Sequence, residues 1–111
     1  MAGEPLTPVQ QRAIQALVVL DRHVVVVRGY LFGSYVEGTA DGDSDVDLAA
    51  FVETEEELSI RRKAQLMSAV QEEVGDDVEV HLFPASALED AEAASFARFI
   101  QRKGQALRFK P

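Results

Sequence analysis

The sequence contains no cysteine, no tryptophan and no long apolar run. Without cysteine, the chain forms no disulfide bond and no cysteine-ligated zinc site. Its apolar runs, such as Val24–Val27, are much too short to cross a bilayer. The first residues lack the basic stretch and following apolar run of a signal peptide. We therefore expect a cytoplasmic protein with no membrane association.

Positive charge is also scarce, with 11 Lys and Arg residues against 19 Asp and Glu residues and a formal net charge of −8. Proteins that bind nucleic acid neutralise phosphates with clustered Lys and Arg side chains, and anionic membranes attract the same residues. We therefore expect neither nucleic acid nor membrane as a partner. An acidic chain is better suited to divalent cations or a basic protein partner, although net charge also serves solubility alone.

The 111 residues, of which 47% are hydrophobic, fit a single compact domain spanning residues 1–111. Three helices are expected where a capping residue precedes a helical pattern of apolar residues, over 8–22, 55–74 and 87–103. The capping residues are Thr7, Thr54 and Ser86. Three strands are expected over 24–32, 45–52 and 77–83. Strands that alternate with helices predict an α/β domain whose helices cover the sheet.

The segment that carries chemistry begins with Gly33 and Ser34, continues through ten residues and ends in Asp-Val-Asp-Leu at residues 45–48. A glycine at the end of a strand lets backbone amides approach a phosphate closely, and the serine hydroxyl adds a donor. Asp45 and Asp47 are two residues apart on a strand, so both carboxylates project from the same face. Bound cations relieve their repulsion, and oxygen ligands of this kind suit Mg²⁺ or Mn²⁺.

A third carboxylate is available on the strand expected over residues 77–83. Valines flank Glu79 on both sides, so its side chain leaves the face opposite theirs. If this strand neighbours the one that carries the aspartates, Glu79 converges on them and completes a site for two metal ions. Asp77 is the alternative candidate, and His81, which shares a face with Glu79, is interpreted as a polar neighbour rather than a ligand.

The stretch GSYVEGTADGDSDVDL resembles the signature of the polymerase-β-type nucleotidyltransferase superfamily. In that signature Gly-Ser is followed, after a spacer of this length, by Asp-hydrophobic-Asp-hydrophobic. The short chain is most similar to the minimal nucleotidyltransferases, members of which act as antitoxins beside HEPN-type toxins. The resemblance implies an α/β (α+β) fold with a small mixed sheet flanked by helices. It also implies transfer of AMP from ATP to a hydroxyl, in some members a tyrosine of the partner toxin.

The resemblance implies a role for each residue of the motif. Gly33 and Ser34 would hold the nucleoside triphosphate. Asp45 and Asp47 would bind two Mg²⁺ ions, or Mn²⁺ in their place. Glu79, at a position where the family often has Asp, would bind one of the ions and assist deprotonation of the attacking hydroxyl.

One position departs from the family pattern. The family commonly has a basic residue in the turn after Gly-Ser, in a pattern like GSRARG, whereas Glu37 stands at that place here. An acidic side chain near a triphosphate disfavours its binding, so the alternative interpretation is a catalytically inactive relative that neutralises its partner by contact alone. Arg61, Arg62 and Lys63 could supply phosphate contacts instead, although nothing in the sequence positions them at the site.

Two other motifs fit the same residues less well. Counted as a calcium-binding EF-hand loop from Asp41, the segment has Val46 where the loop requires glycine. Gly33 and Gly38 have the spacing of a phosphate-binding P-loop, but Thr39 occupies the position of the lysine that this loop needs. Neither motif is predicted.

Overall fold

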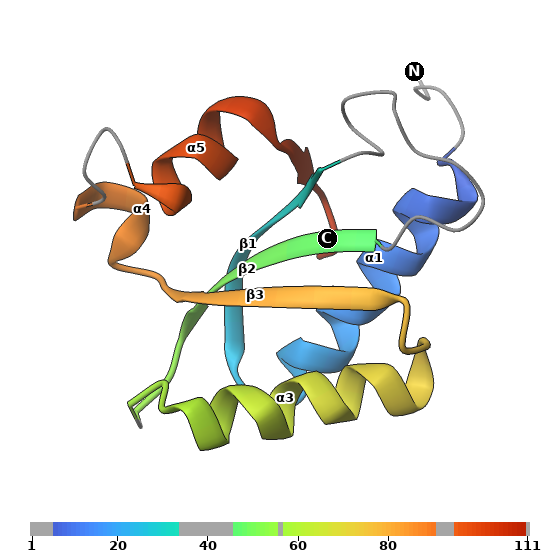
Figure 1. The fold of residues 1–111 in the computed structure, drawn as a ribbon, viewed down its shortest axis with the longest axis horizontal. Helices are drawn as coiled ribbons and strands as arrows, with labels where there is room; N and C mark the ends of the chain where they lie inside the picture. The colour runs from blue at the N-terminus through green and yellow to red at the C-terminus, as the bar shows by residue number, and fades with distance from the viewer. Residues whose placement is uncertain (1–5, 34–45, 56, 91–94, 111) are drawn as a thin grey trace.

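The computed structural model describes residues 6–33, 46–55, 57–90 and 95–110. In this part of the chain, helices cover both faces of a four-stranded sheet (Figure 1). The helices are α1 (Pro8–Asp21), α3 (Ile60–Glu73), α4 (Ala87–Asp90) and α5 (Phe96–Lys103). The strands are β1 (Val25–Phe32), β2 (Val46–Glu53), β3 (Val78–Pro84) and β4 (Gln105–Leu107). This arrangement confirms the predicted α/β (α+β) class.

The first helix, α1, begins where the sequence predicts because Thr7 and Gln10 form a capping box. The Gln10 amide donates a hydrogen bond to the Thr7 hydroxyl at 3.1 Å, and the Thr7 amide donates one to the Gln10 side chain at 2.9 Å. Pro8 occupies the first turn, where no intrahelical partner exists for a backbone N–H. The fully buried face of α1 includes Ala16 and Leu17, which pack on the sheet.

The second predicted helix begins later than expected, at Ile60, because Ser59 rather than Thr54 caps it. The Ser59 hydroxyl accepts a hydrogen bond at 3.1 Å from a backbone amide of the first turn. Val70 is buried as predicted, whereas Ile60 is 89% exposed and Leu66 takes the other fully buried position. The shorter α3 therefore covers the sheet with a narrower apolar face than the sequence pattern indicated.

The third predicted helix is divided, because Ser95 has an extended backbone and caps α5 separately from α4. Its hydroxyl accepts a hydrogen bond from the Arg98 amide at 3.1 Å. Gly104 ends α5 as predicted. The chain then forms the short strand β4 against β1, which the sequence pattern did not indicate.

The strand order β3-β2-β1-β4 makes a mixed sheet, as the family resemblance implies. β1 is antiparallel to both β2 and β4, whereas β2 and β3 are parallel. A parallel pair needs a crossover connection, and α3 provides it by returning the chain from the end of β2 to the start of β3. The beginnings of β2 and β3 therefore lie side by side at one edge of the sheet (Figure 1).

The two faces of the sheet carry different apolar clusters. The larger one, which includes Leu48 and Val80, lies between the sheet and the two helices α1 and α3. The smaller one, centred on Phe51 and Ile100, lies beneath α4 and α5. Because side chains alternate along β2, Asp47 emerges on the face that α5 covers in part. None of the described helices combines the length and apolar character needed to cross a membrane.

Candidate functional site

Asp47 and Glu79 lie opposite each other on neighbouring strands. The parallel pairing of β2 with β3 aligns Asp47 with Glu79 and, one residue earlier, Val46 with Val78. Both valines are buried in the cluster beneath α1 and α3, so both acidic side chains emerge on the opposite face. The Asp47 side chain is 28% exposed and that of Glu79 is 53% exposed. Two of the three predicted carboxylates are thus brought together within reach of solvent.

Gly33 follows β1 and lies against the Asp47 carboxylate. The antiparallel pairing of β1 with β2 aligns Phe32 with Asp47, so the chain leaves β1 directly beside that side chain. Gly33 has φ +83°, a conformation that side chains other than glycine rarely adopt. A Cβ atom here would lie 2.4 Å from Asp47 Oδ2, well inside van der Waals contact. The site therefore requires glycine for its backbone conformation and also for space.

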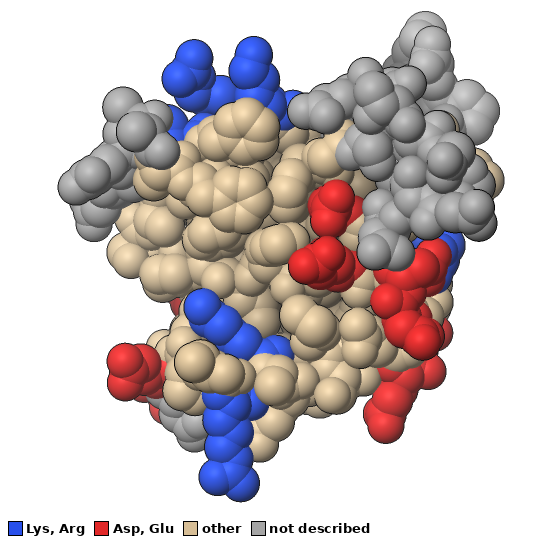
Figure 2. All heavy atoms as spheres, in the orientation of Figure 1, with Lys and Arg blue, Asp and Glu red and all other residues tan. Residues whose placement is uncertain are grey.

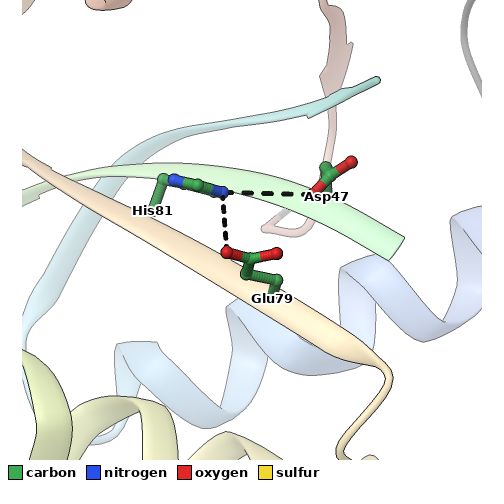
Figure 3. A group of neighbouring side chains, drawn as sticks. All are labelled: Asp47, Glu79 and His81. Carbon is green, nitrogen blue, oxygen red and sulfur yellow. Dashed lines mark ion pairs between the residues drawn. The ribbon is translucent and has the colours of Figure 1, made fainter. Parts of the chain in front are cut away.

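His81 is a close neighbour of both carboxylates. Its Nε2 atom lies 3.7 Å from Glu79 Oε1 and 4.0 Å from Asp47 Oδ1 (Figure 3). One ligand atom from each of these three residues can be chosen so that all lie within 4.8 Å of one another. The sequence signals the shared face of His81 and Glu79, which are two residues apart on β3. It does not signal the approach of His81 to Asp47, which depends on the parallel register.

Three residues that the sequence singles out fall outside the described part of the chain, namely Ser34, Glu37 and Asp45. Their roles in holding a triphosphate or a metal ion stay predictions. The described site consists of the three side chains drawn in Figure 3 and the glycine that follows β1.

Asp77, the alternative third carboxylate, ties two elements of the fold together. It forms an ion pair with the Arg12 guanidinium on α1, and Arg12 also donates a hydrogen bond to the Val74 carbonyl at 2.9 Å. The hydrogen bond from Arg12, together with its positive charge, holds the pKa of the Asp77 carboxyl below its usual range, although burial opposes this. Of the two candidates, only Glu79 is aligned with Asp47.

The basic residues Arg61, Arg62 and Lys63 lie far from the carboxylates. They belong to the first turn of α3, which packs against the face opposite Asp47. From Asp47 to the end of β2 the chain advances by about 20 Å, at about 3.3 Å per residue, before α3 begins. Figure 2 shows acidic side chains over the beginnings of β2 and β3, with Lys and Arg over α5 and the start of α3. These three residues are therefore not positioned to contact a phosphate held beside Asp47.

The described donors fit a divalent cation. Carboxylates aligned on adjacent strands repel one another, and a cation between them removes that repulsion while gaining the oxygen ligands that Mg²⁺ and Mn²⁺ prefer. Because Gly33 has no side chain, the Asp47 carboxylate can lie directly against the backbone that follows β1. The arrangement suits chemistry in which a phosphate is held next to a carboxylate that can accept a proton.

Comparisons with known proteins identify a family and a shared fold. The family model described as "Polymerase beta, Nucleotidyltransferase" matches residues 15–107 of the chain. A solved structure of a toxin–antitoxin with AMP-PNP is similar with a TM-score of 0.60 and 22% sequence identity. The similarity covers 87% of this chain and 73% of the other, and at this identity it shows a shared fold. A search of curated protein sequences finds no match.

Proposed function

Because the chain belongs to the polymerase-β nucleotidyltransferase family, we propose that it transfers AMP from ATP to a hydroxyl group of a partner protein in the cytoplasm. The alignment of Asp47 with Glu79 beside Gly33 is the observation that carries this proposal. The partner is proposed to be a HEPN-type toxin, with this chain as its antitoxin. Similarity to a structure of a toxin–antitoxin with AMP-PNP supports both the nucleotide and the protein partner.

Each residue of the motif has a proposed task. Gly33 and Ser34 hold the triphosphate through backbone amides and a hydroxyl. Asp45 and Asp47, with Glu79, hold two Mg²⁺ or Mn²⁺ ions. When bound there, such ions neutralise the charge of the triphosphate and lower the pKa of the attacking hydroxyl.

The transfer forms one bond and breaks one. The acceptor oxygen bonds to the α-phosphorus of ATP, and the bond from that phosphorus to the oxygen bridging to the β-phosphate breaks, with its electron pair leaving on pyrophosphate. The hydroxyl proton passes to the Glu79 carboxylate and from there to water. Glu79 suits this task because its side chain is 53% exposed, so an acceptor on a protein surface can reach it.

The test is a transfer assay with ATP labelled in its α-phosphate, Mg²⁺ and the protein encoded beside this one. We expect label to appear on the neighbour protein. The variant Asp47→Asn should lower the rate at least about 100-fold, since even residues that only support metal ligands contribute roughly 10- to 100-fold. Glu72→Gln is the matched control, because it neutralises an exposed carboxylate on α3, on the opposite side of the sheet.

Urea unfolding checks that the variants are folded. Asp47 is partly exposed, and asparagine has nearly the same shape as aspartate, so the substitution does not alter the packing of the sheet. Urea unfolding should therefore give closely similar stabilities for the native chain and both variants. Full transfer by a folded Asp47→Asn variant would refute the assigned role of this carboxylate.

A second candidate function is neutralisation of the partner by binding alone. Glu37, which stands where the family commonly has a basic residue, favours this alternative. The binding candidate predicts a stable complex with the neighbour protein, no transferred label and no Mg²⁺-dependent heat of ATP binding in calorimetry. Under the transfer proposal, ATP binds with Mg²⁺, and Glu37→Arg strengthens that binding.

A further inference from the structure

The third side chain of the site, His81, is fixed in position by the aromatic rings around it. Its ring contacts Phe32 edge to face, with centroids 5.2 Å apart and an interplanar angle of 64°. It contacts Phe96 at the start of α5 in the same way, at 5.6 Å and 81°. The imidazole thus lies between two elements, with Nε2 directed at the carboxylates of Asp47 and Glu79 (Figure 3).

The spacing of the three side chains fits a shared ion. Divalent metals bind oxygen and nitrogen at about 2.1 Å, so two ligands of one ion are about 3.0 Å apart when adjacent and about 4.2 Å apart when opposite. The Nε2 atom of His81 lies within this range of both carboxylates, at 3.7 and 4.0 Å. One ligand atom from each of the three residues can be chosen so that all lie within 4.8 Å of one another. Because the Glu79 side chain is 53% exposed, its rotation can bring the carboxylate toward the other two ligands without repacking the core.

We propose that His81 is a metal ligand, so that this site holds a divalent transition metal such as Mn²⁺ in preference to Mg²⁺. The inference rests on the proposed function, because it specifies the ion held by Asp47 and Glu79. An imidazole nitrogen is a good ligand for transition metals, whereas Mg²⁺ prefers oxygen ligands throughout. Mn²⁺ also accepts carboxylate and phosphate oxygens, so it remains compatible with a nucleoside triphosphate.

The direct test is pulsed electron paramagnetic resonance of the whole chain loaded with Mn²⁺ in the absence of nucleotide. A nitrogen nucleus bonded to Mn²⁺ gives a coupling that oxygen ligands do not give. We expect this coupling in the native chain and its loss in His81→Gln. His23→Gln is the matched control, because His23 is the other histidine of the sequence, is exposed, and precedes β1 at the end of the sheet remote from Asp47.

Calorimetric titration with Mn²⁺ and with Mg²⁺ gives a second readout. Replacement of His81 by Gln should lower the affinity for Mn²⁺ at least about tenfold and leave the affinity for Mg²⁺ nearly unchanged. Bound Mn²⁺ without nitrogen coupling in the native chain, or coupling that persists in His81→Gln, would overturn the inference. So would an unchanged ratio of the two affinities.

These outcomes are separable from those of the proposed function. Transfer of labelled AMP that depends on Asp47, in a chain whose Mn²⁺ shows no nitrogen coupling, removes His81 from the ligand set and leaves the transfer proposal standing. Nitrogen coupling that depends on His81, in a chain that transfers no label, establishes His81 as a ligand and favours the binding candidate over the transfer proposal.

Discussion

Replacing Gly33 with Ala tests whether the position of the Asp47 carboxylate limits the proposed transfer. The new Cβ would lie 2.4 Å from Asp47 Oδ2. An ordinary contact is about 3.5 Å, so the carboxylate must move by about 1 Å. A displacement of about 1 Å in a reacting site lowers the rate by roughly 100-fold. Alanine at φ +83° also adds backbone strain of about 1–2 kcal/mol.

Two measurements separate the loss of geometry from the loss of stability. Transfer of α-labelled AMP is measured below the unfolding transition, and the free energy of unfolding is measured with urea. Gly75→Ala is the matched control, because Gly75 has φ +133° and its Cβ would lie 2.7 Å from Arg12 Nη2 and 2.9 Å from Asp77 Oδ1, with no Asp47 atom among its nearest neighbours. We expect both variants to lose stability and only Gly33→Ala to lose transfer. Full transfer by Gly33→Ala, or an equal loss in both variants, would refute the reasoning.

Two further predictions concern the framework around the site. Gly29→Ala should destabilise the fold by about 1–3 kcal/mol in urea unfolding, because its Cβ would lie 2.4 Å from Cδ1 of the fully buried Leu17. In the double variant, Leu17→Ala should relieve this loss of stability. Additive losses from the two substitutions would contradict the assigned clash. Asp77 has a pKa lowered by Arg12, so its stabilising effect is complete above its ordinary pKa of 3.8 and is lost as the pH falls through the lower folded value. Asp77→Asn should therefore be less stable than the native chain at pH 7, with a difference that shrinks below pH 3.8; a difference independent of pH would contradict this.

Much of the fold is predictable from local signals in the sequence. The capping box at Thr7 places the start of α1, and alternation of apolar residues places β2 and β3 within one residue of their observed bounds. The errors arise where two local signals compete. Both Thr54 and Ser59 are acceptable caps, and the structure uses the later one. A different error concerns β4, which has only three residues and is specified by its pairing with β1. No local pattern in the sequence reveals that pairing.

The candidate site is less predictable, because it depends on distances between strands. Alternation shows that Asp47 and Glu79 each project from the face opposite the apolar side chains of their own strand. It does not show that the two strands are parallel neighbours. That arrangement follows from the crossover through α3. It also brings His81 to both carboxylates. Because this approach depends on the pairing of two strands, the sequence of β3 alone indicated only a polar neighbour at this position.

The register that stabilises the core is the same register that builds the site. A slip of one residue between β2 and β3 would move every side chain of one strand to the other face. Val46 and Leu48 are 1% and 0% exposed, so such a slip would bury Asp47 in the apolar cluster beneath α1 and α3. Burial of an unpaired carboxylate is strongly unfavourable. The valines and leucines of these strands therefore fix the spacing of the carboxylates.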